Sequence, residues 1–143
     1  AMMGHPDVAF VGAIGQPDAY SGELPAAYVE LKEGANTSID DLLAFAKENI
    51  TEHAALPKHI EVMDELPKTA VGKIFKPDLR RSAITRIYNA ALKDAALAAT
   101  VTEVIEDKKL GLVAVIDGGG SGITDEEIQH VLGTFNRPWK WAA

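Results

Sequence analysis

The stretch "ELPKTAVGKIFKPDLRR" (Glu65–Arg81) gathers lysines, arginines and two prolines in the middle of an otherwise acidic chain. Pro67 fixes the backbone at the entry, and Gly72 permits a conformation that a β-carbon would forbid. An apolar pair follows Lys73 and can anchor the exit. The pattern predicts a β-hairpin that presents the Lys73 ammonium group, which suits a mobile anion such as a carboxylate or phosphate. A solubilising surface lysine is the ordinary alternative.

Upstream of this hairpin, the apolar pattern predicts two strands, a helix and a third strand. The strands cover 7–15 and 26–34, with about ten polar residues between them. Thr37 or Ser38 is expected to cap the helix, and its core face is expected to contain Ile39, Leu42, Leu43, Ala46 and Ile50. In the third strand, over 58–66, Ile60 and Val62 are expected to face inward.

Downstream, Pro77 suits the first turn of a helix that keeps its apolar spacing to about residue 98. A hairpin over 100–117 and a last helix beginning near Thr124 follow. The intervening "DGGGSG" is expected to be a connector and not a phosphate loop, because it lacks the Gly-Lys-Ser/Thr ending and acidic residues follow it. Thr124 and Glu127 have the spacing of a capping box.

These elements predict the α+β class: a small, mostly antiparallel sheet with packed helices and the lysine-bearing hairpin, followed by a C-terminal αββα extension. We expect two domains, at 1–81 and 82–143. The extension is expected to pack on the first domain and enlarge its core. The alternative is a partner or dimer contact through "NRPWKWAA", because tryptophan is favoured at interfaces.

Composition excludes several kinds of function. The chain has 143 residues and a net charge of −7, which argues against nucleic acid and anionic membranes as partners. It has no cysteine, and no apolar run approaches the ~20 residues that span a bilayer. We therefore expect a cytoplasmic protein. Its N-terminus has no signal-peptide pattern and suggests a fragment of a longer protein. We predict no metal site, since the histidines His5, His53, His59 and His130 lack ligand spacing.

The central stretch closely resembles a C-terminal motif of AMP-forming adenylating enzymes, which include acyl-CoA synthetases, luciferases and the adenylation domains of peptide synthetases. That motif runs approximately L-P-x-T-x-x-G-K-I-x-R-x-x-L-R. The matching residues here are Leu66, Pro67, Thr69, Gly72, Lys73, Ile74, Leu79 and Arg80. The upstream "HPDVAFVGAIGQPDAYSGELPAAYVELKEG" is also similar to this family, so the resemblance covers about residues 5–81.

The resemblance implies that this chain is the mobile C-terminal lid domain of an acyl-CoA synthetase. Its partner would be an N-terminal domain that binds ATP, the carboxylic acid and Mg²⁺. Lys73 would bridge the carboxylate and the α-phosphate as acyl-AMP forms, and the lid would then swing so that coenzyme A can attack. Fatty acids are the expected substrate class. Without the ATP-binding domain and the hinge before the lid, this fragment is expected to be inactive.

A few further residues are candidates for substrate contacts. Gly72 is expected to shape the lysine turn, Lys58 is a candidate contact for coenzyme A, and Arg80, with Arg81, is a candidate for steering nucleotide phosphates. For Lys58 and Arg80, simple surface charge is the alternative. One departure from the family is Lys76, which occupies a position usually held by arginine and lacks its bidentate geometry.

Two other functions fit the sequence less completely. An adenylation domain that loads a carrier-protein thiol would share the motif, but the chain contains no carrier-like serine segment. A non-catalytic α+β interaction module could use the basic hairpin to bind an acidic partner.

Overall fold

The computed structural model describes residues 4–50, 56–120 and 122–142. Along the chain the elements are β1 (Val8–Asp18), β2 (Gly22–Leu31), α1 (Ile39–Asn49), β3 (His59–Met63), α2 (Lys76–Asp94), β4 (Thr100–Asp107), β5 (Gly111–Asp117), α3 (Asp125–Leu132) and β6 (Trp139–Trp141). They form two compact units. The first comprises the chain up to Gly15 together with Leu24–Leu79, and the second comprises Gln16–Glu23 and Arg80 onward.

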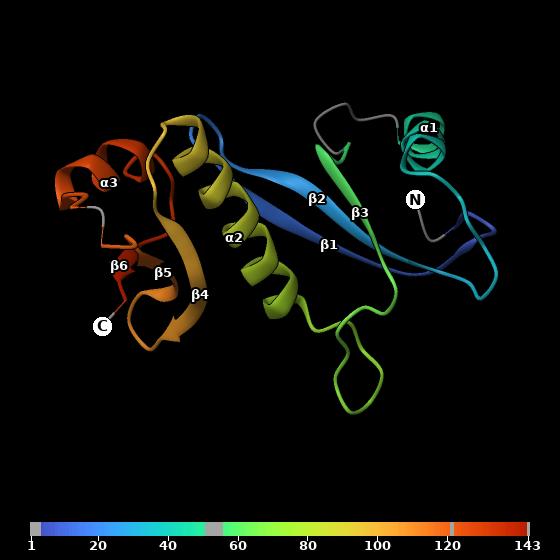
Figure 1. The fold of residues 1–143 in the computed structure, drawn as a ribbon. Helices are drawn as coiled ribbons and strands as arrows, with labels where there is room; N and C mark the ends of the chain where they lie inside the picture. Colours follow the sequence, from blue (N-terminus) through green and yellow to red (C-terminus); the bar gives the residue numbers. More distant parts are fainter. Residues whose placement is uncertain (1–3, 51–55, 121, 143) are drawn as a thin grey trace. The chain divides into compact units, whose positions relative to one another are not determined.

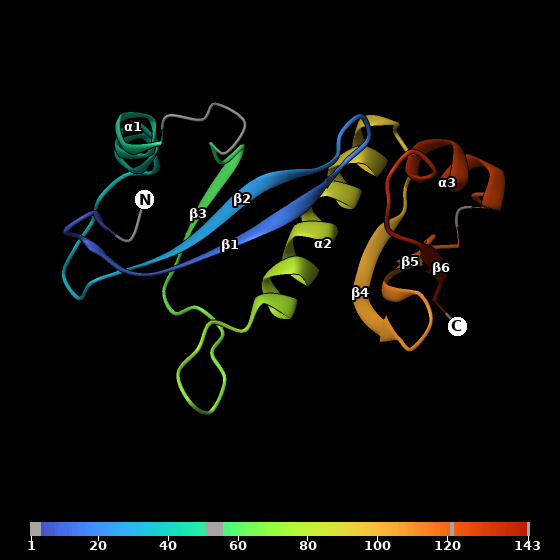
Figure 2. The same ribbon diagram turned by 180° about the vertical axis from the view of Figure 1, so that it is seen from behind.

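The first unit is built on a sheet in which β2 lies between β1 and β3 (Figures 1 and 2). β2 and β3 run parallel, with Ala27 opposite Ile60. The apolar face of α1 buries Leu42 and Ala46 in a cluster with Val29 of β2 and Ile60 of β3. This cluster is the core of the first unit.

The N-terminus of α1 follows the prediction, while two of the expected core residues do not. Ser38 is the cap, and its hydroxyl accepts a hydrogen bond from the Asp41 amide at 3.1 Å. Ile39 and Val62, however, are 47% and 37% exposed and lie outside the buried cluster beneath α1. Helical spacing in α1 and alternation in β3 identified the apolar positions. They did not show which of these positions α1 and the sheet bury between them.

The β1–β2 hairpin is longer than expected. β1 continues through Pro17 to Asp18, and the turn has only three residues, so these adjacent strands run antiparallel. The Asp18 carboxylate closes this turn by accepting hydrogen bonds from the amides of Tyr20 and Ser21 at 3.1 and 2.8 Å. Because β1 is an edge strand, Pro17 removes no bond from the interior of the sheet. Turn-forming residues therefore did not mark the strand end.

The second unit contains the sheet β4–β5–β6 with α2 and α3. β4 and β5 form the predicted antiparallel hairpin, and β5 pairs in parallel with the short β6, which the sequence did not indicate. The buried cluster combines residues from both helices and both long strands. It contains Ile84, Tyr88, Leu92, Ala99, Val101, Val104, Ala114, Ile116, Ile128 and Leu132. The Tyr88 hydroxyl donates to the Arg137 carbonyl at 2.7 Å, and its burial raises the Tyr88 pKa to about 12.

The predicted α+β class is confirmed, and both sheets are mixed. Each contains a parallel pair because a helix connects the two strands concerned: α1 between β2 and β3, and α3 between β5 and β6. Parallel neighbours require such a crossover connection. The capping box of Thr124 and Glu127 at the start of α3 is also confirmed. None of the helices described here is long and apolar enough to span a membrane.

The helix α2 ends at Asp94, earlier than the predicted residue 98, because its chain reverses at Ala96. The Leu97 amide donates to the Leu92 carbonyl and the Ala96 amide to that of Lys93, at 3.0 and 2.9 Å. This is the pattern of a Schellman C-cap, and its left-handed position is occupied by Ala96 with φ of 57°. Glycine normally fills this position because a β-carbon is strained there.

We therefore expect Ala96→Gly to stabilise the chain by about 1 kcal/mol, since relief of strain exceeds the added freedom of the unfolded chain. Urea unfolding monitored by tryptophan fluorescence measures the change. Ala98→Gly is the matched control, because Ala98 has no positive φ and is expected to be neutral or destabilising. Equal effects of the two substitutions would contradict the argument.

Candidate functional site

The hairpin that presents Lys73 lies between β3 and α2 and projects away from the sheet of the first unit (Figure 1). Lys68 and Ile74 form its antiparallel bridge. Two backbone hydrogen bonds close it: the Thr69 amide donates to the Lys73 carbonyl at 2.7 Å, and the Phe75 amide donates to the Pro67 carbonyl at 2.8 Å. The predicted hairpin is therefore present, and its shape is set by its own backbone.

The turn at the tip depends on Gly72. Its φ is +83°, and no atom lies within 4 Å of the position that a β-carbon would take. The glycine is needed for its backbone conformation and not for space. Its amide donates to the Thr69 carbonyl at 2.9 Å, which places Lys73 directly after the turn.

The base of the hairpin is anchored by apolar packing on β1. Leu66 and Leu79 are each 1% exposed. A β-carbon at Gly12 would lie 2.4 Å from Leu79 Cδ1 and 3.0 Å from Ile74 Cγ2. The absence of a side chain at Gly12 thus lets the exit of the hairpin and the first turn of α2 sit directly on β1.

A partly buried ion pair between Glu30 and Lys68 provides a second anchor for the hairpin. Glu30 Oε1 of β2 accepts hydrogen bonds from Lys68 Nζ at 2.7 Å and from the Leu66 amide at 2.9 Å. The two side chains are only 16% and 19% exposed. Lys68 Nζ also lies 4.5 Å from the centroid of the Phe10 ring. The hydrogen bond from Lys68 is the main reason why the pKa of Glu30 is lowered.

Lys73 differs from Lys68 in having no such partner. Its side chain is exposed, and its ammonium group makes no hydrogen bond or ion pair with any part of the chain that the structure describes. The surrounding surface is partly apolar, because Val71 and Phe75 are 81% and 38% exposed. A mobile cation beside exposed apolar side chains can meet an anion when a partner surface excludes water.

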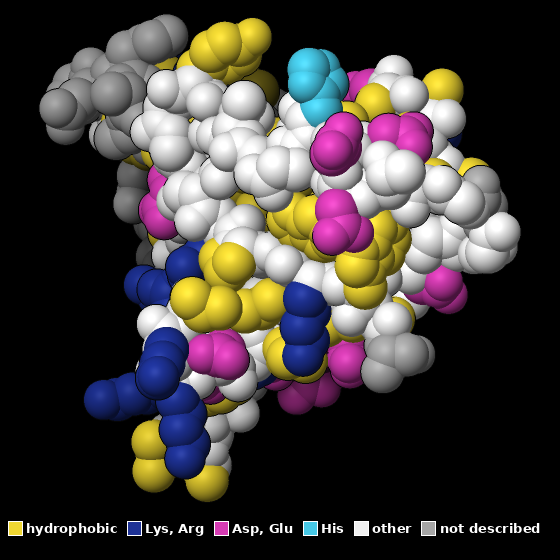
Figure 3. All heavy atoms as spheres, turned by 90° about the vertical axis from the view of Figure 1, so that its left-hand side faces the viewer, with side chains coloured by type: hydrophobic (Ala, Val, Ile, Leu, Met, Phe, Trp, Pro, Cys, Tyr) yellow, Lys and Arg dark blue, Asp and Glu magenta, His cyan; other side chains and the backbone are white. Residues whose placement is uncertain are grey.

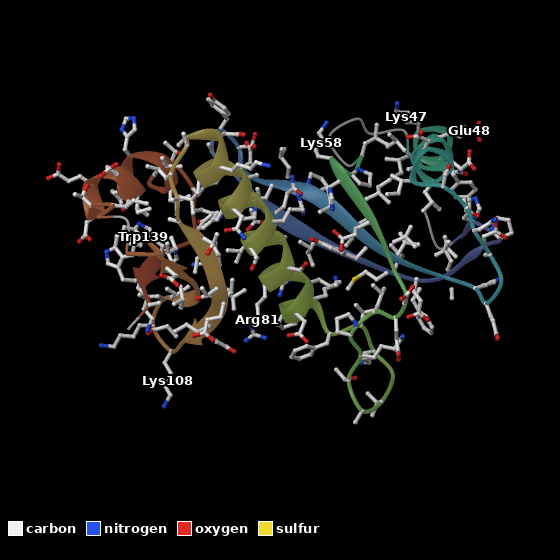
Figure 4. All side chains as sticks on the ribbon, viewed as in Figure 1. Lys47, Glu48, Lys58, Arg81, Lys108 and Trp139 are labelled. Carbon is white, nitrogen blue, oxygen red and sulfur yellow. The ribbon has the colours of Figure 1, made fainter. Side chains whose placement is uncertain are left out.

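Of the other candidate residues, Gly72 adjoins Lys73, whereas Lys58 lies away from it. Lys58 is exposed just before β3, whereas the Lys73 hairpin follows β3, so the two lie at opposite ends of this strand (Figures 1 and 4). Arg80 is exposed in α2 and belongs to the second unit. In the part of the chain that is described, no group of three or more histidine and acidic side chains could hold a metal ion. His53 lies outside the described residues.

The first half of the chain matches a known protein family. The model of the AMP-binding enzyme C-terminal domain matches residues 1–73 of this chain. The chain belongs to this family. The match ends on Lys73, so the hairpin anchors contributed by Phe10, Glu30 and Lys68 all lie within it.

Two curated relatives are CoA ligases. The marinolic acid–CoA ligase of Pseudoalteromonas sp. (strain SANK 73390) is 36% identical over 97% of this chain and 22% of its own length. A long-chain-fatty-acid–CoA ligase of Escherichia coli O6:H1 is 38% identical over 63% of this chain and 16% of its own length. This chain therefore spans about a fifth, or less, of the length of these two curated relatives.

Solved structures agree with this assignment. The anthranilate CoA ligase AuaEII in complex with anthranoyl-AMP matches with a TM-score of 0.54 at 31% identity, over 60% of this chain and 17% of that chain. Apo MatB from Rhodopseudomonas palustris matches with a TM-score of 0.51 at 29% identity, over 55% and 16%. In both cases the AMP-binding C-terminal domain is a small part of a larger chain.

Beyond this family match, the C-terminal tryptophans are packed within the second unit. Trp139 and Trp141 are half-buried against the second cluster, with their rings edge to face at 5.3 Å. The indole N–H groups donate to Gln129 and Asp125 of α3. On the face that contains α3, hydrophobic side chains are visible between acidic and basic ones (Figure 3). A partner or dimer contact through this segment, and the domain division at residue 82, stay predictions.

Sequence reasoning missed the residues that hold the hairpin. Glu30 and Lys68 are 38 positions apart, and Phe10 and Gly12 are on a different strand from either. The only local signal was a glutamate within an apolar strand pattern, which is also typical of a solvent-facing position.

Because the folded-state pKa of Glu30 is lowered, its stabilising contribution is complete above the ordinary value of 4.5 and is lost as the pH falls through the folded-state pKa. We expect Glu30→Gln to lower the free energy of unfolding by about 1–3 kcal/mol at neutral pH, since Lys68 loses its carboxylate. The difference from wild type should shrink as the pH falls below 4.5. Urea unfolding across this pH range measures it.

Glu106→Gln is the control for this experiment, because that carboxylate is 75% exposed and 4.0 Å from Arg81. It is expected to change stability by less than about 1 kcal/mol. A Glu30→Gln effect as small as that of the control at neutral pH would contradict a structural role for the pair.

Proposed function

We propose that this AMP-binding C-terminal domain is the mobile lid of a full-length acyl-CoA synthetase, in which Lys73 acts in adenylate formation. In the first half-reaction a carboxylate oxygen of the acid attacks the α-phosphorus of ATP, the bond to the β-phosphate oxygen breaks, and pyrophosphate leaves. In the second, the thiol of coenzyme A attacks the acyl carbonyl of the adenylate and AMP leaves.

The observation that carries this proposal is the contrast between the fixed base of the hairpin and the unpaired ammonium near its tip. Negative charge accumulates around the α-phosphate as the carboxylate attacks, and a positioned cation in a closed site stabilises it. Lys73 can supply that cation without first breaking an ion pair, since its ammonium has no partner among the described residues. The side chain is flexible, so the backbone of the hairpin must set its position.

The placement of Lys58 supports a role in the other half-reaction. It lies at the opposite end of β3 from the Lys73 hairpin. A lid that rotates between the two half-reactions presents different ends of such a strand to the active site. Lys58 is thus proposed to contact coenzyme A, Arg80 to steer nucleotide phosphates, and Gly72 to hold the turn.

The remaining substrates and partners follow from the same proposal. The N-terminal domain of the same polypeptide would bind ATP, hold Mg²⁺ and select the acid. Ligases named for marinolic acid and for long-chain fatty acids among the relatives support a carboxylic acid, with fatty acids as the proposed class, as the substrate. Their names also support coenzyme A, and not a carrier-protein thiol, as the acyl acceptor. Exposed Val71 and Phe75 beside Lys73 provide apolar surface for the closed lid.

The test uses the full-length polypeptide with Lys73→Ala. Pyrophosphate release from ATP and a fatty acid is expected to fall by about two orders of magnitude or more, because one charge-stabilising group is lost. Thioester formation from pre-made acyl-adenylate and coenzyme A is expected to remain near the wild-type rate.

Lys108→Ala is the matched control, since Lys108 is an exposed lysine in the β4–β5 turn (Figure 4). It should leave both half-reactions unchanged. Adenylate formation that survives Lys73→Ala would show that the hairpin lysine has no catalytic part, and the proposed function of the hairpin would be lost.

A further inference from the structure

The Glu30 carboxylate connects two points at the start of the Lys73 hairpin. Its Oε1 atom receives the Leu66 amide, which belongs to the backbone entering the hairpin, and the Lys68 ammonium, which belongs to the first strand of the hairpin itself. Lys68 Nζ also lies 3.4 Å from the Leu66 carbonyl. A single carboxylate therefore ties the entry of the hairpin to β2.

Lys68 passes this constraint on to the segment that contains Lys73. Its backbone forms the antiparallel bridge with Ile74, the residue directly after Lys73. The next residue, Thr69, bonds to Lys73 twice: its amide donates to the Lys73 carbonyl, and its hydroxyl accepts from the Lys73 amide at 3.2 Å. Each of these bonds joins the Lys73 strand to the strand that Glu30 holds.

The ammonium group of Lys68 also lies over the ring of Phe10 in β1. With its ammonium between the Glu30 oxygen at 2.7 Å and the Phe10 ring at 4.5 Å, the side chain is held by two different strands of the sheet. Because both contacts involve a charged ammonium whose side chain is only 19% exposed, they are stronger than fully exposed contacts of the same kind. The two lysines of the hairpin thus have different tasks.

We propose that Glu30 and Lys68 form a positioning pair for Lys73, so that adenylate formation depends on this pair while thioester formation does not. This inference rests on the proposed function of Lys73. Neither Glu30 nor Lys68 would contact the reacting atoms. Loss of the pair would release the Lys68 segment of the hairpin from β2 and spread the Lys73 ammonium over a larger volume. Displacement of a catalytic group by about 1 Å can cost as much as 100-fold in rate.

The experiment compares Glu30→Gln and Lys68→Met in the full-length polypeptide, at a temperature at which each variant has a wild-type circular dichroism spectrum. Glutamine keeps an acceptor for the Leu66 amide and removes the charge, while methionine keeps an unbranched apolar stem over Phe10. Each variant is expected to lower the kcat for pyrophosphate release by about tenfold or more, with the KM for ATP and for the fatty acid nearly unchanged. Thioester formation from pre-made acyl-adenylate should stay within about twofold of wild type.

Two further variants separate positioning from a loss of folded protein. The double variant Glu30→Gln/Lys68→Met should be no less active than the less active of the two single variants. The reason is that both substitutions remove the same interaction. Lys68→Arg retains the cation and should recover adenylate formation to within about threefold of wild type. Glu106→Gln is the matched control and should leave both half-reactions unchanged.

The outcomes distinguish this inference from the proposed function. If Lys73→Ala abolishes adenylate formation but Glu30→Gln and Lys68→Met do not, the positioning pair is wrong and the proposed function stands. If both half-reactions fall equally in the pair variants, the pair has only a structural role. If Lys73→Ala itself leaves adenylate formation intact, the proposed function fails, and the positioning role fails with it.

Discussion

At Gly12, the backbone of β1 passes so close to Ile74 and Leu79 that a β-carbon would meet both side chains. The hairpin and the start of α2 depend on this contact, because it seats the exit of the hairpin directly on the sheet. The buried Leu66 fixes the entry on the other side of the turn. Packed interiors deform little, so these apolar anchors limit the movement of the hairpin base, and the Glu30–Lys68 pair adds a polar anchor beside them.

Between these anchors, the same residue type has two opposite environments. Lys68 is enclosed by a carboxylate and an aromatic ring, and this pairing restricts its motion. Lys73 extends from the same hairpin, and its ammonium has no partner among the residues that the structure describes. An ion pair at Lys73 would have to be broken before the ammonium could meet another anion, and the former partner would be left as an uncompensated charge. The hairpin therefore combines a fixed frame with a free charge.

The second unit shows that residues beyond the family match can have a core of their own. Its cluster draws on α2, α3 and the two long strands, and the parallel pairing of β6 with β5 brings the two tryptophans onto it. The marinolic acid–CoA ligase aligns with 97% of this chain, so that relative contains a sequence similar to this unit. The tryptophans, for which an interface was the alternative prediction, contribute to the packing of this unit.

The order of apolar patterns along the chain was sufficient for the α+β class. Local patterns limited the cap of α1 to Thr37 or Ser38 and were sufficient for the capping box of α3 and the hairpin at Lys73. Each of these depends on residues within a few positions of one another, such as Thr124 with Glu127 or Gly72 with Lys73. Family resemblance, and not periodicity, indicated a catalytic role for Lys73. The tertiary structure decided which lysine of the hairpin is held and which is free, because Glu30 and Phe10 come from distant strands. The tertiary structure also decided that β2 pairs in parallel with β3 and β5 with β6, how far β1 extends, and where the left-handed turn at Ala96 ends α2. These features depend on strand order and packing, which local spacing does not specify.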